Sequence, residues 1–301
     1  MLTDGVRPDW FDARLFPVES RWLDVDGCSI HYVDEGSGPT LLMLHGNPTW
    51  SFLYRRLIAG LADRFRCVAL DYPGFGLSGA RAGYGFTPQE HAAVVTSFVR
   101  ELDLRDATPI VQDWGGPIGL SAVLADRDRY SRLIIGNTWA WPMSTIKMQV
   151  FSELMGGSVT GGLMSRRFNA FVGQIIPRSM RRRELTDAEM AMYRGPFPTD
   201  ESRVPVQVFP REITKAKTLL AELADRADSY ADLPTLLLWA DADIAFGPSE
   251  FSRWNLVLDD VRPYVLHGAG HYWQDDAGEE AALAIRSWWD GALVLGDDPV
   301  A

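Results

Sequence analysis

One aspartate, Asp113, carries the strongest chemical signature in the sequence. It lies in the segment VQDWGG (111–116), directly after a short apolar run and before small residues. This layout is typical of a nucleophile elbow, a sharp strand-to-helix turn that exposes one side chain. An ionised carboxylate there needs no base to attack saturated carbon and form an ester. A serine-type esterase is excluded because the position lacks serine; the alternative is that Asp113 only caps the following helix.

A histidine and an acid complete a possible triad. His271 follows the last apolar run, in GAGHY (268–272), and Asp243 follows the preceding run, in WADAD (239–243). The order nucleophile, acid, histidine is that of the α/β-hydrolases. His271 would be the base and Asp243 would orient it, with Asp241 as the competing acid. A lone histidine is often structural, so the prediction rests on the conjunction of the three.

Two hydrogen-bond donors accompany the nucleophile. Asn47 follows a strand-like run and offers a side-chain amide, and Trp114 offers an indole N–H that can only donate. Together they suggest two donors that converge on a soft anion, although a tryptophan beside a nucleophile usually only packs. Their backbone N–H groups are expected to hold an oxyanion.

Short apolar runs at regular intervals indicate the elements that must position these residues. A hairpin is predicted over 22–25 and 29–33, around Asp26 and Gly27. Further strands are predicted at 40–44, 66–70, 109–111, 132–135, 235–239 and 264–266. Runs without alternation favour strands buried on both faces. Helical patterns between them, such as the one capped by Thr87, indicate a mostly parallel, doubly wound α/β sheet of the α/β-hydrolase fold.

Residues 139–215 interrupt this rhythm and are predicted to form a helical cap domain. The core domain would comprise residues 1–138 and 216–301. Trp139 and Trp141, which follow a strand end, are expected to line the substrate pocket. The cap would provide adaptable apolar packing, because it holds seven of the nine methionines: Met143, Met148, Met155, Met164, Met180, Met190 and Met192. Residues 181–183, three arginines, are expected to form a solvated helix face.

Composition excludes several classes of protein. Lys and Arg total 29 against 40 Asp and Glu, a net charge of −11, so neither nucleic acid nor an anionic membrane is an expected partner. No apolar stretch reaches the length of a bilayer span. Two cysteines, Cys28 and Cys67, favour a reduced, cytoplasmic protein. No metal-ligand spacing and no dinucleotide fingerprint occur, so neither a metal nor another cofactor is expected.

These motifs resemble those of the haloalkane dehalogenases, a family of α/β-hydrolases with a helical cap. The resemblance runs from about residue 16 to 289. Its most specific segments are HGNPTWSFLYR (45–55), DYPGFGLS (71–78), QDWGGP (112–117) and GH (270–271).

The resemblance implies a role for each candidate residue. Asp113 would be the nucleophile, His271 the base, and Asn47 with Trp114 the halide-binding pair. No carboxylate follows the strand that ends at Gly136, so Asp243, which aligns better than Asp241, would be the acid. An Asp-His-Asp triad with an Asn-Trp pair resembles one subgroup of the family, whose members tend to self-associate. A homo-oligomer is therefore expected by resemblance only.

The predicted reaction hydrolyses a haloalkane to a primary alcohol, a halide ion and a proton through an aspartyl alkyl ester. An epoxide hydrolase of the same fold is the nearest alternative, but it normally uses two cap tyrosines and residues 139–215 contain only Tyr193. A fluoroacetate-type dehalogenase would be expected to carry arginine where Trp114 stands. A catalytically silent small-ligand-binding α/β-hydrolase is a further alternative.

Overall fold

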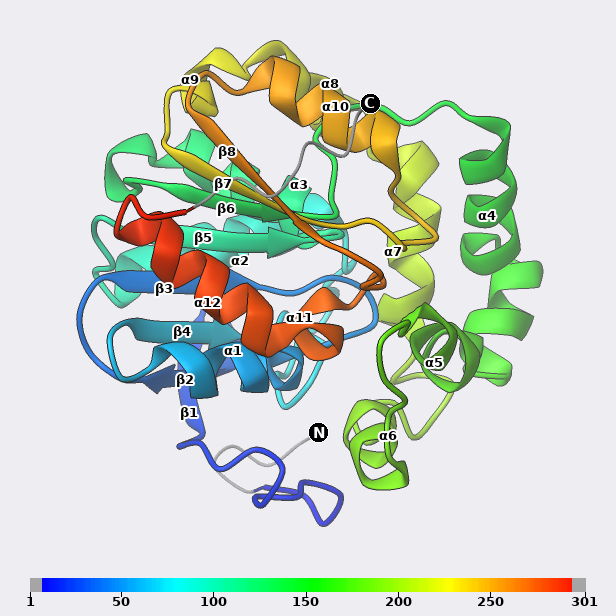
Figure 1. The fold of residues 1–301 in the computed structure, drawn as a ribbon. Coiled ribbons are helices and arrows are strands. Elements are labelled where there is room, and N and C mark those ends of the chain that lie inside the picture. The colour runs from blue at the N-terminus through cyan, green and yellow to red at the C-terminus, as the bar shows by residue number, and fades with distance from the viewer. Residues whose placement is uncertain (1–6, 294–301) are drawn as a thin grey trace.

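A single eight-stranded sheet lies at the centre of the computed structural model, which describes residues 7–293 (Figure 1). Its strands follow the order β1-β2-β4-β3-β5-β6-β7-β8. They are β1 (Arg21–Val25), β2 (Cys28–Glu35), β3 (Thr40–Leu44), β4 (Arg66–Leu70), β5 (Thr108–Gln112), β6 (Leu133–Gly136), β7 (Thr235–Ala240) and β8 (Val261–Leu266). Strand β2 runs antiparallel to β1 and β4, and all the other neighbouring pairs are parallel. The predicted mostly parallel sheet is confirmed.

The sequence pattern of each strand follows from its place in the sheet. Every residue of β3, β5, β6 and β7 is buried, which explains their continuous apolar runs. The predicted hairpin is also present, with Val25 opposite Cys28. Asp26 and Gly27 turn the chain there with φ values of 53° and 77°, as a tight two-residue turn requires.

Helices cover both faces of the sheet (Figure 1). On one face α1 (Arg55–Leu61), α11 (Trp273–Asp276) and α12 (Gly278–Trp289) pack together; on the other lie α2 (Pro88–Glu101), α3 (Gly115–Ala125), α8 (Lys217–Asp225) and α9 (Asp228–Ala231). Helix α10 (Pro248–Val257) connects β7 to β8, and 3-10 turns occupy Ser51–Tyr54 and Arg127–Arg129. Helix α2 begins with the predicted cap, in which Thr87 and Glu90 exchange hydrogen bonds.

The chain between β6 and α8 is helical wherever it has regular structure. It contains α4 (Ile146–Gly156), α5 (Ile176–Ser179), α6 (Asp187–Arg194), α7 (Val204–Lys215) and two π-helical segments, Gly162–Arg167 and Phe171–Ile175. These helices gather on one side of the molecule, beyond the end of the sheet (Figure 1). They lie where a cap would cover the carboxyl ends of the strands, and the division into core and cap domains stays a prediction.

The prediction for residues 181–183 is wrong. They form a loop after α5 rather than a solvated helix face. Their three backbone N–H groups donate to the Asp276 carboxylate, and the Arg183 guanidinium pairs with Asp275 and Glu189. Charge runs usually face solvent, but this one meets buried carboxylates of α6 and α11, which the local sequence does not reveal.

A buried group of five side chains, which we call the cap-anchor cluster, joins the inserted helices to the core. Its members are Arg55, Arg183, Glu189, Tyr193 and Asp275. Arg55 donates to both oxygens of Asp275, at 2.8 Å each, and to Glu189. The Tyr193 hydroxyl donates to Asp275 at 2.8 Å. These bonds fix α6 against α1 and α11.

Two further features bear on the composition. Cys28 and Cys67 are buried, unpaired thiols. Within residues 7–293, every helix falls short of the length and apolarity that a membrane span requires.

Candidate active site

The turn between β5 and α3 has the conformation of a nucleophile elbow. Asp113 adopts φ = 51°, a left-handed conformation that costs free energy and persists only where the surroundings impose it. The small neighbours are necessary. A Cβ at Gly115 would overlap the Leu44 carbonyl oxygen, and one at Gly116 would overlap the Thr138 side chain. The turn therefore holds the Asp113 carboxylate beyond the end of the sheet.

The two oxygens of Asp113 have different surroundings. Oδ1 accepts a hydrogen bond of 2.8 Å from the backbone N–H of Asn47, and the backbone N–H of Trp114 also donates to the carboxylate. Oδ2 lies 3.8 Å from Nε2 of His271, too far for a hydrogen bond. Burial raises the pKa of Asp113, an effect that His271 and these two N–H groups reduce but do not cancel. Oδ1 is thus held by the Asn47 N–H, whereas Oδ2 is the oxygen that faces His271.

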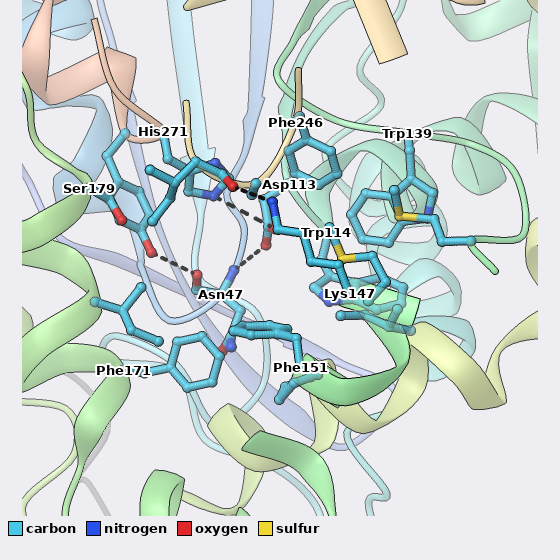
Figure 2. Close-up of a pocket in the computed structure, with 18 residues that line it drawn as sticks. Asn47, Asp113, Trp114, Trp139, Lys147, Phe151, Phe171, Ser179, Phe246 and His271 are labelled. Atoms are coloured by element: carbon cyan, nitrogen blue, oxygen red, sulfur yellow. Dashed lines mark hydrogen bonds and ion pairs between the residues drawn. The ribbon is translucent and has the colours of Figure 1, made fainter. Parts of the chain in front are cut away.

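His271 lies between two carboxylates, as Figure 2 shows for Asp113. Its Nδ1 is 2.9 Å from Oδ2 of Asp243; because a carboxylate only accepts, Nδ1 carries the proton. Its backbone N–H donates to the Ser179 carbonyl of α5 at 3.1 Å. Burial alone would lower the pKa of His271, but Asp243 and Asp113 outweigh it and raise that pKa.

The competing acid lies elsewhere. Asp241 accepts hydrogen bonds from His267 and from the backbone N–H of Gly268. The structure therefore brings Asp243, and not Asp241, to His271.

The Asn47 and Trp114 side chains both reach the same cavity. The indole N–H of Trp114 has no hydrogen-bond partner among residues 7–293. Its ring is held by stacking on Phe209 and by an edge contact with Trp139. Asn47 donates one amide hydrogen to the Val206 carbonyl at 3.3 Å, which leaves its second amide hydrogen without a described acceptor. Both donors thus belong to residues that line the same cavity as Asp113.

The cavity above Asp113 has a volume of about 300 Å³, and aromatic side chains surround it in Figure 2. Its walls are mostly apolar: Trp114, Trp139, Met143, Met148, Phe151, Phe171, Ile175, Pro210, Ile213, Ile244, Ala245, Phe246 and Tyr272, with Asn47, Asp113, Lys147, Ser179 and His271 as the polar members. Lys147 of α4 donates to the Ile244 carbonyl at 2.9 Å. Such a cavity suits a small apolar ligand.

Of the two tryptophans expected to line this pocket, only Trp139 does so. The prediction for Trp141 is wrong. Its ring packs on Trp254 of α10, with a centroid distance of 5.0 Å, and the Arg253 guanidinium lies over it. Two residues further from the strand end, the chain has already turned toward α10.

The sequence alone predicts no catalytic role for three residues near the nucleophile: Gln112, Phe246 and His45. Gln112 contacts His271 through its amide, and Phe246 lines the cavity beside it. His45 is structural: it accepts from the Tyr72 N–H and contacts the Gly46 carbonyl, and burial lowers its pKa to about 4. The position of Gln112 directly before the nucleophile was the one available signal.

The fold and the elbow define the class of protein, and comparison with known proteins agrees. The model of the alpha/beta hydrolase fold family matches residues 39–277, so the chain belongs to that family. A relative named haloalkane dehalogenase 2, from Mycobacterium tuberculosis, is 43% identical over 91% of this chain and 96% of its own length. Within the α/β-hydrolases, the chain belongs to the haloalkane dehalogenase family.

The chain is also similar to a solved dehalogenase structure and to a relative with a different named activity. The crystal structure of haloalkane dehalogenase DbeA from Bradyrhizobium elkani has a TM-score of 0.82 and 27% identity, covering 91% of this chain and 98% of that one. A cis-3-alkyl-4-alkyloxetan-2-one decarboxylase from Xanthomonas campestris is 31% identical over 88% of this chain and 94% of its own length. The family predicted by resemblance is confirmed; the subgroup stays a prediction.

Proposed function

We propose that this chain is a haloalkane dehalogenase that converts a haloalkane and water to a primary alcohol, a halide ion and a proton through a covalent aspartyl alkyl ester. The observation that carries the proposal is the asymmetry of the Asp113 carboxylate. Oδ1 is held by the backbone N–H of Asn47, while Oδ2 has no hydrogen bond from His271. The carboxylate lies beside an apolar cavity and near the Trp114 indole N–H, which has no partner among residues 7–293.

In the first step Oδ2 of Asp113 attacks the halogen-bearing carbon. A carbon–oxygen bond forms, the carbon–halogen bond breaks, and the electron pair leaves with the halide. The Trp114 indole and the Asn47 amide stabilise that halide. An apolar cavity favours the reaction because it strengthens the interaction of the departing anion with these donors.

In the second step His271 takes a proton from water, whose oxygen attacks Cγ of the Asp113 ester. Asp243 orients His271 for this role. Oδ1 becomes the oxyanion. It already accepts the backbone N–H of Asn47, and the backbone N–H of Trp114 donates to the same carboxylate. The alkyl oxygen then leaves with a proton from His271. Asp113 is left as a carboxylic acid that carries the oxygen from water, and it loses its proton to solvent to restore the carboxylate.

The proposal also assigns the residues of the triad, the halide-binding pair and the cap domain. The triad is Asp113, His271 and Asp243, the halide pair is Asn47 and Trp114, and residues 139–215 form the cap domain. Trp139 lines the pocket and sets part of its shape. The substrates are small apolar haloalkanes, since the cavity is small and its polar groups lie at the nucleophile.

The contacts of Tyr193 weigh against an epoxide hydrolase. It is the one tyrosine in residues 139–215, and its hydroxyl is committed to Asp275 of the cap-anchor cluster. Tyr193 is also not among the residues that line the cavity, so no cap tyrosine is available to polarise an epoxide oxygen.

The test combines substrates and one variant. The wild-type enzyme should release halide from 1-bromobutane or 1,2-dibromoethane and form no diol from styrene oxide. His271→Ala should release about one halide per active site and then stop, with intact-mass analysis showing Asp113 alkylated. Steady turnover by that variant would remove His271 from the mechanism. Diol formation without halide release would indicate an epoxide hydrolase. Release of carbon dioxide from a 2-oxetanone would indicate a decarboxylase. The absence of any product would indicate a catalytically silent ligand-binding protein.

A further inference from the structure

Gln112, the last residue of β5, contacts the proposed base directly. Its side chain is completely buried. Its Nε2 lies 2.9 Å from Nε2 of His271 and 3.2 Å from the His271 carbonyl oxygen. Its Oε1 has no hydrogen-bond partner among residues 7–293. The amide thus meets both the ring and the backbone of one residue, His271.

These contacts fix which atoms carry protons. The His271 carbonyl can only accept, so the NH₂ end of Gln112 faces His271. An amide N–H can only donate, so Nε2 of His271 must be the acceptor and carry no proton. Nδ1 of His271 donates to Asp243 at 2.9 Å. Both ring nitrogens are therefore specified by their partners.

We propose that Gln112 is a positioning residue that keeps His271 neutral, with the proton on Nδ1 and with an unprotonated Nε2 that accepts the Gln112 N–H beside Asp113. This inference rests on the proposed function for its catalytic consequence, but the protonation state itself concerns the resting protein.

Gln112 acts against the other groups that face His271. Asp243 and Asp113 both favour the imidazolium and raise the pKa of His271 against the effect of burial. Tyr272, whose ring centroid lies 4.8 Å away, stays uncharged because burial raises its pKa well above the usual value. An imidazolium would direct an N–H at the Gln112 amide, while the Asp113 oxygen is 3.8 Å away. Gln112 thus favours the neutral form of His271, whereas Asp243 and Asp113 favour the imidazolium.

The contact also orders the second step. An imidazole nitrogen has one lone pair, so the water that gives its proton to Nε2 takes the place of the Gln112 N–H. By then Asp113 is a neutral ester and no longer favours the imidazolium. Neutral His271 is consequently favoured most while the ester exists, because Asp113 has then lost its charge and only Asp243 still favours the imidazolium.

The experiment replaces the amide with a side chain of similar length. Gln112→Met removes the donor, and Gln112→Glu replaces it with an acceptor. The matched control is Gln207→Met in α7, whose amide donates to the Gly157 carbonyl far from His271. Nitrogen-15 NMR of labelled histidines in the free enzyme, with the His271 signal identified by its loss in His271→Ala, reads the tautomer and the pKa without any substrate.

The wild-type spectrum should show His271 protonated on Nδ1 at neutral pH. Gln112→Met should raise the pKa of His271 by up to about one unit, the worth of one hydrogen bond. Gln112→Glu should raise it further, by about 1 to 3 units, because a carboxylate favours the imidazolium. Gln207→Met should leave it unchanged. A proton on Nε2 in the wild type, or an equal pKa in all the variants, would overturn the proposal.

Single-turnover kinetics supply the second readout. Hydrolysis of the ester needs neutral His271, so its midpoint should move to higher pH in Gln112→Met, while the halide burst keeps its amplitude. An unmoved midpoint would contradict the catalytic consequence. A wild-type protein that releases no halide would overturn the proposed function alone, since the NMR titration still decides the role of Gln112.

Discussion

Asp113 and Asp275 are both enclosed carboxylates, but their surroundings are opposite. Asp275 has no exposed side-chain surface, and the Arg55, Arg183 and Tyr193 side chains surround it. Asp113 keeps 15% of its side-chain surface exposed, accepts backbone hydrogen bonds from Asn47 and Trp114, and has no arginine partner within residues 7–293. One carboxylate is saturated with charged donors and the other is left incomplete.

This difference separates a structural cluster from a reactive one. Charged donors on every lone pair hold a carboxylate in place and remove its reactivity, as in the cap-anchor cluster. A buried carboxylate without a counter-charge has a raised pKa and stays nucleophilic once it ionises. In the proposed mechanism, the substrate carbon supplies the partner that Asp113 lacks, and the departing halide supplies the partner that the Trp114 indole lacks.

Asp113→Asn gives the largest effect that this comparison predicts. The amide keeps the shape and tolerates φ = 51°, but it is a poor nucleophile, so kcat should fall by at least about 10⁴-fold. The melting temperature should stay the same or rise, because a poorly compensated charge is removed. Steady-state halide release and a thermal melt measure the two quantities; substantial residual turnover would contradict the assignment of the nucleophile.

Asp243→Asn tests whether the acid works through the tautomer of His271. An asparagine amide can donate to Nδ1 and move the imidazole proton to Nε2, which should lower kcat by up to about 10⁴-fold. Asp241→Asn is the matched control, since Asp241 pairs with His267 instead, and its activity should stay near that of the wild type. The reverse result would transfer the role to Asp241.

Asp275→Asn should affect stability instead of chemistry. It removes one of the two carboxylates that Arg55 and Arg183 share, and breaking such a buried pair costs about 3–5 kcal/mol of unfolding free energy. Denaturant unfolding measures this loss. Asp290→Asn is the control, because the Arg64–Asp290 pair is largely exposed and its loss should be small. Equal effects of the two substitutions would show that the cap-anchor cluster contributes no more than a surface pair.

The smallest predicted difference between the catalytic site and the cap-anchor cluster is the pH at which each loses its function in acid. Burial raises the pKa of Asp113 above 3.8, so halide release should fall as the pH drops through a midpoint above that value. Burial opposes the shift at Glu189, but hydrogen bonds from Arg183, Thr186 and Arg55 lower its pKa to about 2 from 4.5. The stability contributed by Glu189 is therefore complete above pH 4.5 and is lost toward pH 2.

Burst amplitude and circular dichroism followed over the same acid titration test this order. Activity should be lost at higher pH than the fold. Simultaneous loss of both signals would mean that unfolding, and not protonation of Asp113, sets the acid limit.

Most of the sheet and the elements of the site were predictable from the sequence, because both depend on local patterns. Runs such as 40–44 and 235–239 reveal strands buried on both faces, and Asp113 between a strand and glycines reveals the elbow. The predictions for Trp141 and for residues 181–183 failed for the opposite reason. Their decisive partners, Trp254 for Trp141 and Asp276 for residues 181–183, lie more than 90 positions away in the chain.

The sequence by itself determined the kind of chemistry: a carboxylate at an elbow, a histidine and acids after later strands, and two donors near the nucleophile. Only the tertiary structure decided between Asp241 and Asp243, brought Trp139 and not Trp141 to the cavity, and brought the Gln112 amide to Nε2 of His271. Residue type and local spacing specify which groups can react, whereas hydrogen bonds of about 3 Å between distant segments exist only once the chain has folded.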